Sequence, residues 1–85
     1  MKAIITKYHG PSNVRGSRYS ASDEDRNRVI LSADDALSSE ENHDRAAIAL
    51  CRKMNWTRHN LMRGHLKNAN IYVFEDETAR VGVSK

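Results

Sequence analysis

Alternating apolar and polar positions predict three strands in the first third of the chain. Residues 1–8, MKAIITKY, are rich in β-branched and aromatic side chains, which favour a strand. Gly10 and Pro11 end this strand, because proline has no N–H to donate to a sheet. Residues 17–21 and 28–32 flank a turn rich in Asp and Asn, so they predict a β-hairpin with a polar tip.

The helical pattern is the clearest in the chain, and it predicts a helix over residues 39–55. Ser38 can cap this helix because Glu41 follows three residues later, as a capping box requires. Acidic side chains lie in its first turns and basic side chains in its last turn, an order that suits the helix dipole. Apolar residues at intervals of three and four form one stripe along it: Ala47, Leu50, Cys51 and Met54. The stripe indicates that the helix packs against a sheet.

A strong strand pattern follows in the C-terminal part of the chain, at residues 71–75, IYVFE. A short strand near Leu61 and Met62 would pair with it as a second hairpin. From Asp76 onward the chain is polar, which predicts a flexible tail over residues 76–85.

Together these elements predict one α+β domain over residues 1–75. We expect a mostly antiparallel sheet of three to four strands with one helix packed on one face. The order of elements is ββαβ-like, or βββαββ when the short strands are counted. The predicted core comprises Ala3, Ile5, Val29, Leu31, Ala47, Leu50, Cys51, Met54, Trp56, Tyr72 and Phe74.

The composition narrows the class of protein. Eighty-five residues suffice for one domain with a thin core. Cys51 is the only cysteine, which excludes an intrachain disulfide and suits the reducing cytoplasm. No stretch approaches the ~20 apolar residues of a membrane-spanning helix. Residues 1–10 also lack the long apolar run of a signal peptide. We therefore expect a cytoplasmic protein without membrane contact.

The net charge of +3 hides a block pattern along the chain. Residues 1–20 and 45–70 contain basic side chains and no acidic one, whereas residues 21–44 hold eight acids and two arginines. If the two basic blocks meet in the fold, they form a positive face that attracts phosphate or an acidic protein surface. The alternative is that opposite blocks neutralise each other across the surface.

The sequence contains no motif for catalysis, for a cofactor or for a metal. Cys51 lies on the apolar stripe of the helix, so we expect a buried structural thiol rather than a nucleophile. His43 is two helical turns from Cys51, too far for a nucleophile–base pair along the helix. The chain has no CxxC, HExxH, GxGxxG or P-loop spacing. We expect a protein that is not an enzyme and that carries no cofactor.

Five short segments carry a resemblance: KAIITKY, NVRGSR, ASDED, ALCRKMNW and NIYVF. They resemble a set of short proteins without settled function from proteobacterial chromosomes, prophages and plasmids. The resemblance covers roughly residues 2–75, and RGSR and LCRKM are its most specific parts. It implies a small accessory product of mobile elements, and it assigns no catalytic residue.

The leading hypothesis is a small non-enzymatic binding protein whose basic loops contact DNA or RNA. The predicted phosphate contacts are Lys7, Arg15, Arg18, Arg58, Arg63 and Lys67. The alternative is an inhibitor or accessory factor, such as an anti-CRISPR-like protein, that binds an acidic or a nucleic-acid-binding protein. Its motivation is the acidic surface between Asp23 and Asp44. A homodimer through the uncovered face of the sheet is a further alternative.

Overall fold

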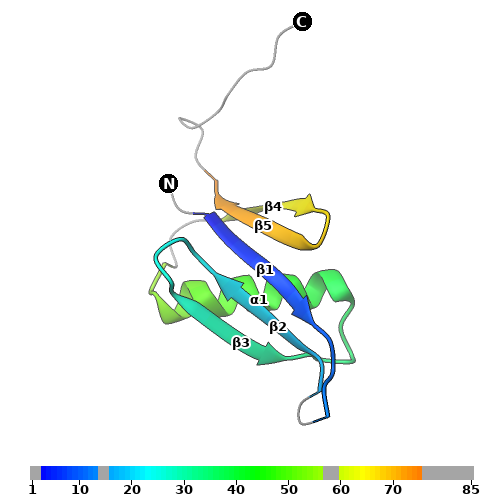
Figure 1. Cartoon of the computed structure of the whole chain (residues 1–85). Helices are drawn as coiled ribbons and strands as arrows, with labels where there is room; N and C mark the ends of the chain where they lie inside the picture. Colours follow the sequence, from blue (N-terminus) through cyan, green and yellow to red (C-terminus); the bar gives the residue numbers. More distant parts are fainter. Residues whose placement is uncertain (1–2, 14–15, 57–59, 76–85) are drawn as a thin grey trace, which may run out of the picture.

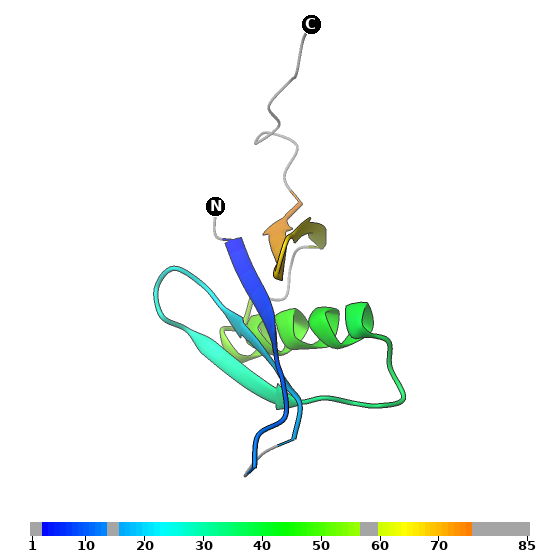
Figure 2. The same cartoon turned by 45° about the vertical axis from the view of Figure 1, so that its right-hand side comes forward.

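Polar turns and alternating segments fold the chain into one antiparallel sheet with a single helix on one face. The computed structural model describes residues 3–13, 16–56 and 60–75. The elements, in chain order, are β1 (Ala3–His9), β2 (Arg18–Ser22), β3 (Arg28–Ser32), α1 (Ser39–Lys53), β4 (Leu61–Leu66) and β5 (Ala69–Phe74) (Figure 1). The strands lie in the order β3-β2-β1-β5-β4, and all neighbours are antiparallel. Figure 2 shows the twist of the sheet and the position of α1 on one side of it.

The predicted α+β class is confirmed, but the sheet has five strands rather than three or four. The difference comes mainly from β4, which extends over six residues although Arg63, Gly64 and His65 interrupt its apolar pattern. The segment has a low intrinsic propensity for a strand, and its pairing with β5 stabilises it. Met62, for example, lies opposite Val73 in a regular ladder. The observed order, βββαββ, is the one expected when short strands are counted.

Local signals at both ends fix the extent of α1. At its start, the N–H of Glu41 donates to Oγ of Ser38 and the N–H of Ser38 donates to Oε1 of Glu41, so the predicted capping box is confirmed. At its end, Asn55 has a φ of 61°, in the left-handed region. The N–H of Trp56 then donates to the carbonyl of Cys51 at 2.8 Å, which closes the last turn. The helix therefore ends at Lys53, slightly earlier than predicted.

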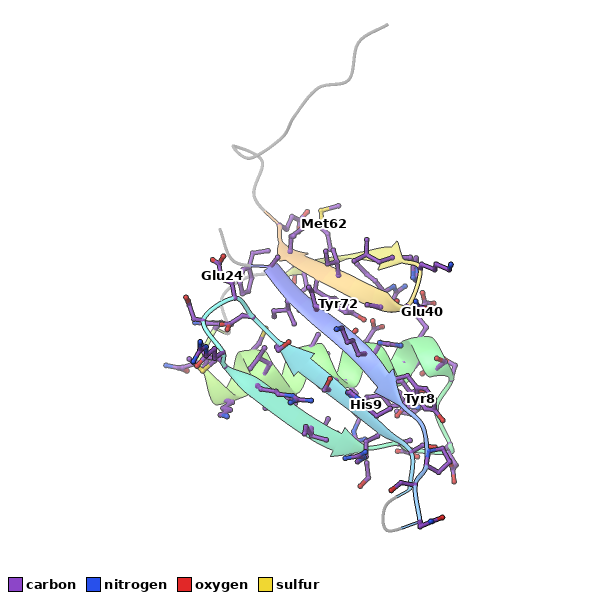
Figure 3. All side chains as sticks on the ribbon, in the orientation of Figure 1. Tyr8, His9, Glu24, Glu40, Met62 and Tyr72 are labelled. Carbon is purple, nitrogen blue, oxygen red and sulfur yellow. The ribbon has the colours of Figure 1, made fainter. Side chains whose placement is uncertain are left out.

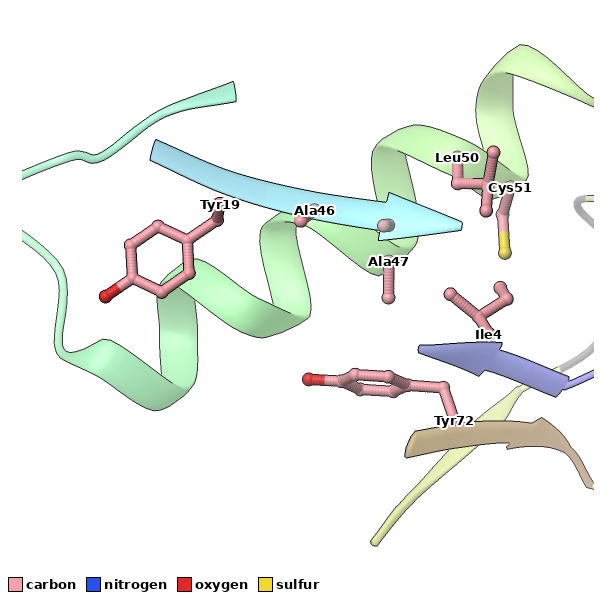
Figure 4. Packing of buried hydrophobic residues seen from close by; sticks show 8 residues of the cluster. Ile4, Tyr19, Ala46, Ala47, Leu50, Cys51 and Tyr72 are labelled. Atoms are coloured by element: carbon pink, nitrogen blue, oxygen red, sulfur yellow. The ribbon is translucent and has the colours of Figure 1, made fainter. Parts of the chain in front are cut away.

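The core lies between α1 and the adjacent face of the sheet (Figure 4). Ala46 and Ala47 have no exposed surface, and their small side chains let the helix approach the strands closely. Trp56 packs edge-on against Phe74 at 5.9 Å between ring centroids, at the margin of this core. The buried apolar residues are Ile4, Tyr19, Ala21, Ala46, Ala47, Leu50, Cys51 and Tyr72.

The predicted inward face of β1 is wrong. Ala3 and Ile5 were expected in the core, but Ile4 and Thr6 are the fully buried residues of this strand. The hydroxyl of Thr6 lies 2.7 Å from Nδ1 of His43 on α1, so a polar residue occupies the inward side. Because side chains alternate along a strand, this one contact reverses the assignment of every residue in β1.

Two further expectations concern the C-terminal tail and a membrane-spanning helix. The tail predicted for residues 76–85 lies outside the described residues. Within the three described ranges, no helix combines the length and the apolar character that crossing a membrane requires.

Candidate nucleic-acid interface

Three cationic side chains and one histidine lie together on the face of the sheet that α1 does not cover. The bond of Thr6 to α1 marks the helix-facing side of β1. Its neighbours in alternate positions, Lys7 and His9, therefore point to the open face. In the register with β2, Lys7 lies opposite Ser20 and His9 opposite Arg18. Paired residues share a face, so Arg18 joins them.

Arg28 extends this surface onto β3. It lies opposite Ser22, which alternates in β2 with Ser20 and Arg18. We call Lys7, His9, Arg18 and Arg28 the basic half of the open face; Figure 3 shows His9 within it. Over β1, β2 and β3, the other residues of this face are apolar or hydroxyl-bearing, and none is acidic.

The charges of the basic half act on one another. Burial lowers the pKa of His9, and the positive charges of Arg18, Arg28 and Lys7 lower it further. His9 is therefore mostly neutral at pH 7, and its Nε2 lies 2.8 Å from Oγ of Ser20. The positive potential at neutral pH thus comes from the other three side chains.

These cations are available for an anion. Among the described residues, no carboxylate forms an ion pair with Lys7, Arg18 or Arg28. The Nε of Arg18 is buried and has no hydrogen-bond partner within the described ranges. The residue Arg18 lines a depression of about 440 Å³ together with Gly16, Ile30 and Ser32. An anion oxygen there would accept hydrogen bonds from the Arg18 guanidinium and the Ser32 hydroxyl.

The predicted phosphate contacts divide into four groups. Lys7 and Arg18 lie in the basic half, whereas Arg15 and Arg58 lie outside the described residues. Lys67 is exposed in the turn between β4 and β5. Arg63 lies opposite Tyr72, a core residue, and so it points to the helix side of the sheet.

The guanidinium group of Arg63 is bonded to acidic side chains within the protein. Its Nη1 donates to Oδ2 of Asp44 at 2.6 Å, and its Nε is 3.1 Å from Oε1 of Glu40. The hydroxyl of Tyr72 donates to the other oxygen of Asp44. His65 lies 3.2 Å from Glu40 through Nε2. These contacts bind the β4–β5 hairpin to α1 and separate Arg63 from the basic half.

Two functional positions were missing from the predicted contacts. His9 lies two residues after Lys7, which in a strand means a shared face, but the predicted strand covered residues 1–8 and His9 was assigned to the segment that ends it. Arg28 falls in the acidic block when charge is counted along the chain. Its alternation with Ile30 and Ser32 is the signal that would have placed it.

The network also perturbs the titration of its members. Burial alone would raise the pKa of Asp44, but hydrogen bonds from Arg63 and Tyr72 and the guanidinium charge hold it below its ordinary value. Burial, with the hydrogen bond to Asp44, raises the pKa of Tyr72 to about 12. Burial lowers the pKa of His43, although Asp44 and Glu40 partly oppose this effect.

We expect the protein to lose stability as the pH falls. Below the ordinary histidine pKa of 6.5, His43 of the unfolded chain takes up a proton more readily than His43 of the folded chain, and His9 acts in the same direction. Below 3.8, unfolded Asp44 is protonated before folded Asp44, so more stability is lost. Urea unfolding at pH 8, 5 and 3 measures both steps.

In the variant Asp44→Asn, the free energy of unfolding should fall less below pH 4, because the carboxyl that is protonated there is missing. In Asp35→Asn, which changes an exposed turn position, the free energy of unfolding should fall as in the wild type. A free energy of unfolding that rises between pH 7 and pH 4 would contradict the expected direction.

The side chains around the cavity between α1 and β4 are weakly reactive. A cavity of about 880 Å³ lies between α1 and β4, with Cys51, Asp44 and Trp56 in its lining. Burial raises the pKa of the Cys51 thiol, so it is protonated at neutral pH and a poor nucleophile. Both oxygens of Asp44 are engaged by Arg63 and Tyr72. No group of three or more His, Cys, Asp or Glu side chains within the described ranges is placed to hold a metal ion.

Comparisons of this chain with protein-family models, with curated proteins and with solved structures find no match. The resemblance to short proteins of proteobacterial chromosomes, prophages and plasmids stays a prediction. The function is therefore argued from the geometry and the charges of the open face.

Proposed function

We propose that this protein is a non-enzymatic nucleic-acid-binding protein whose basic half contacts the phosphate backbone of DNA or RNA. One observation carries the proposal: Lys7, Arg18 and Arg28 come from three adjacent strands, share one face with His9, and have no acidic neighbour on that face over β1–β3. Adjacent strands are about 4.8 Å apart, and Arg28 lies opposite Ser22, four residues from Arg18 along β2, so the three charges spread over about 14 Å along the strands and about 10 Å across them.

Phosphate contacts supply the affinity in this proposal. Guanidinium groups bind phosphate through two parallel hydrogen bonds, and Arg18 lines the depression described above. The aromatic side chains of the strands, Tyr8, Tyr19, Tyr72 and Phe74, occupy positions that face the helix side. Base stacking on aromatic rings is therefore absent from the open face of the strands, and binding should depend strongly on salt and weakly on sequence.

A salt titration tests this proposal. Fluorescence anisotropy with a labelled 20-nucleotide DNA or RNA should show that the logarithm of the association constant falls linearly with the logarithm of salt concentration. Arg18→Ala and Arg28→Ala should each weaken binding at low salt and reduce the slope by about one unit. Arg52→Ala removes the same charge from the exposed side of α1, and it should leave the slope unchanged.

Two results would overturn the proposal. One is the absence of binding to single-stranded or duplex nucleic acid at low salt. The other is a loss of affinity in Arg52→Ala as large as the loss in Arg18→Ala, which would show that total charge rather than the basic half determines affinity.

The second proposed function is a protein-binding inhibitor or accessory factor of a mobile element, of the anti-CRISPR-like kind. Exposed acids in the β2–β3 turn, Glu24 and Asp25, support it, because they lie at one end of the sheet and could meet a basic partner. Capture of a partner from a host lysate that persists after nuclease treatment would favour this function over the first. A cytoplasmic location and a mobile-element origin belong to both proposals.

A further inference from the structure

The β4–β5 hairpin has its apolar side chains on the open face, which reverses the usual arrangement of a half-exposed sheet. An antiparallel sheet with one solvated face normally points apolar residues inward and polar residues outward. In β4, however, Arg63 and His65 point to the helix side, while Met62 and Leu66 lie on the open face. Val73 of β5 lies opposite Met62 and shares that face.

This reversal creates an uncharged surface beside the basic half. We call it the apolar half; its residues are Ala3, Ile5, Met62, Gly64, Leu66, Ala69, Ile71 and Val73. Met62 is 57% exposed, Leu66 54% and Val73 37%. Figure 3 shows Met62 at the outer side of the hairpin, away from α1. A contiguous exposed apolar surface of this kind marks a contact site for another molecule.

The described part of the chain supplies no cover for the apolar half. The helix packs across β1, β2 and β3, on the opposite face of the sheet. The hairpin is attached to α1 through the ion pairs of Arg63 with Asp44 and Glu40, which also lie on the helix side. Burial of this surface against another molecule would therefore be favoured by the hydrophobic effect.

We propose that the apolar half is the contact surface of a symmetric dimer, in which the open faces of two copies pack against each other over β4, β5 and the start of β1. The charges select a second copy as the occupant. An acidic partner would be drawn to the basic half instead, because the apolar half carries no charged side chain. Two copies related by a two-fold axis that runs parallel to the strands place uncharged surface on uncharged surface, and they keep Lys7, Arg18 and Arg28 of each copy at opposite ends of the dimer.

The size of the surface determines the strength of this dimer. About five residues along β4 and β5 and three along β1 give a footprint of at most about 14 by 17 Å. This footprint is smaller than the ~800 Å² per partner of a standard interface, so the dimer should form at micromolar or higher concentration. It would carry one basic half at each end, and its formation does not require that nucleic acid binds there.

Sedimentation velocity at protein concentrations from about 5 to 500 µM tests the proposal, since this range brackets the dissociation constants expected for a small interface. The wild-type protein should shift from monomer towards dimer. The double variant Met62→Ser and Leu66→Ser should raise the dissociation constant about 100-fold or more, because each lost apolar side chain occurs twice in a symmetric interface. Ile48→Ser changes a residue that is 44% exposed on α1, and it should dimerise like the wild type.

Each of two other outcomes would overturn the dimer. The first is a wild-type protein that is monomeric over the whole range. If its affinity for a single-stranded oligonucleotide then falls in the double variant, the apolar half is assigned to nucleobases. The second is a double variant that dimerises as strongly as the wild type while circular dichroism shows both folded. A wild-type dimer that binds no nucleic acid would support this proposal and count against the nucleic-acid function, whereas a dimer that persists in Arg18→Ala shows that dimerisation does not depend on the basic half.

Discussion

Replacing Leu50 by alanine should lower the free energy of unfolding by about 3 kcal/mol. The side chain of Leu50 has no exposed surface and lies at the centre of the contact between α1 and the sheet (Figure 4). Its truncation removes apolar surface from the core and leaves a cavity that the close-packed strands cannot fully close. A domain of this size has only about 5–10 kcal/mol in total, so the loss is a large share. Urea unfolding followed by circular dichroism measures it.

The same substitution at Ile48 provides the matched control. Ile48 lies on the same helix but is 44% exposed, so Ile48→Ala should change the free energy of unfolding by about 0.5 kcal/mol or less. Equal losses for Leu50→Ala and Ile48→Ala would contradict the assigned orientation of α1 on the sheet.

Thr6→Val should lower the free energy of unfolding by about 2 kcal/mol, although the two side chains have nearly the same shape. The hydroxyl of Thr6 is fully buried and lies 2.7 Å from Nδ1 of His43, which is itself buried. The substitution leaves the ring nitrogen without that partner in a site that water reaches poorly, and this desolvation cost dominates. Thermal and urea unfolding at pH 8, where His43 is neutral, isolate the effect.

A double variant separates the hydrogen bond from packing. In Thr6→Val combined with His43→Leu, neither side chain retains a buried polar group, so the combined loss should be smaller than the sum of the two single losses. Purely additive losses would show that the pair contributes packing alone.

The helix and the strands differ in how far the sequence determines them. Ser38, Glu41 and the charges of the first and last turns act within a few residues, so they predict α1 directly. The inward face of β1 depends on a contact between Thr6 and His43, which are 37 residues apart. Ile4 and Ile5 are both apolar, so the alternation itself does not select one of them.

The candidate site shows the same distinction. Lys7 and Arg18 belong to a basic block along the chain, and the block predicts their involvement. Arg28 joins them only through the register of β2 and β3, and counting charges along the chain does not reveal this register. Arg63 leaves the group because Asp44, 19 residues earlier, lies beneath it in the fold.

The first strand of the chain occupies the middle of the sheet, between β2 and β5. On the ribosome, β1, β2, β3 and α1 are all synthesised before residues 69–74 can pair with β1. Until then, one edge of β1 presents unpaired N–H and C=O groups to any other extended chain. A nascent or truncated chain that lacks the last hairpin should therefore be prone to strand addition and aggregation, whereas pairing with β5 protects this edge once the hairpin has formed.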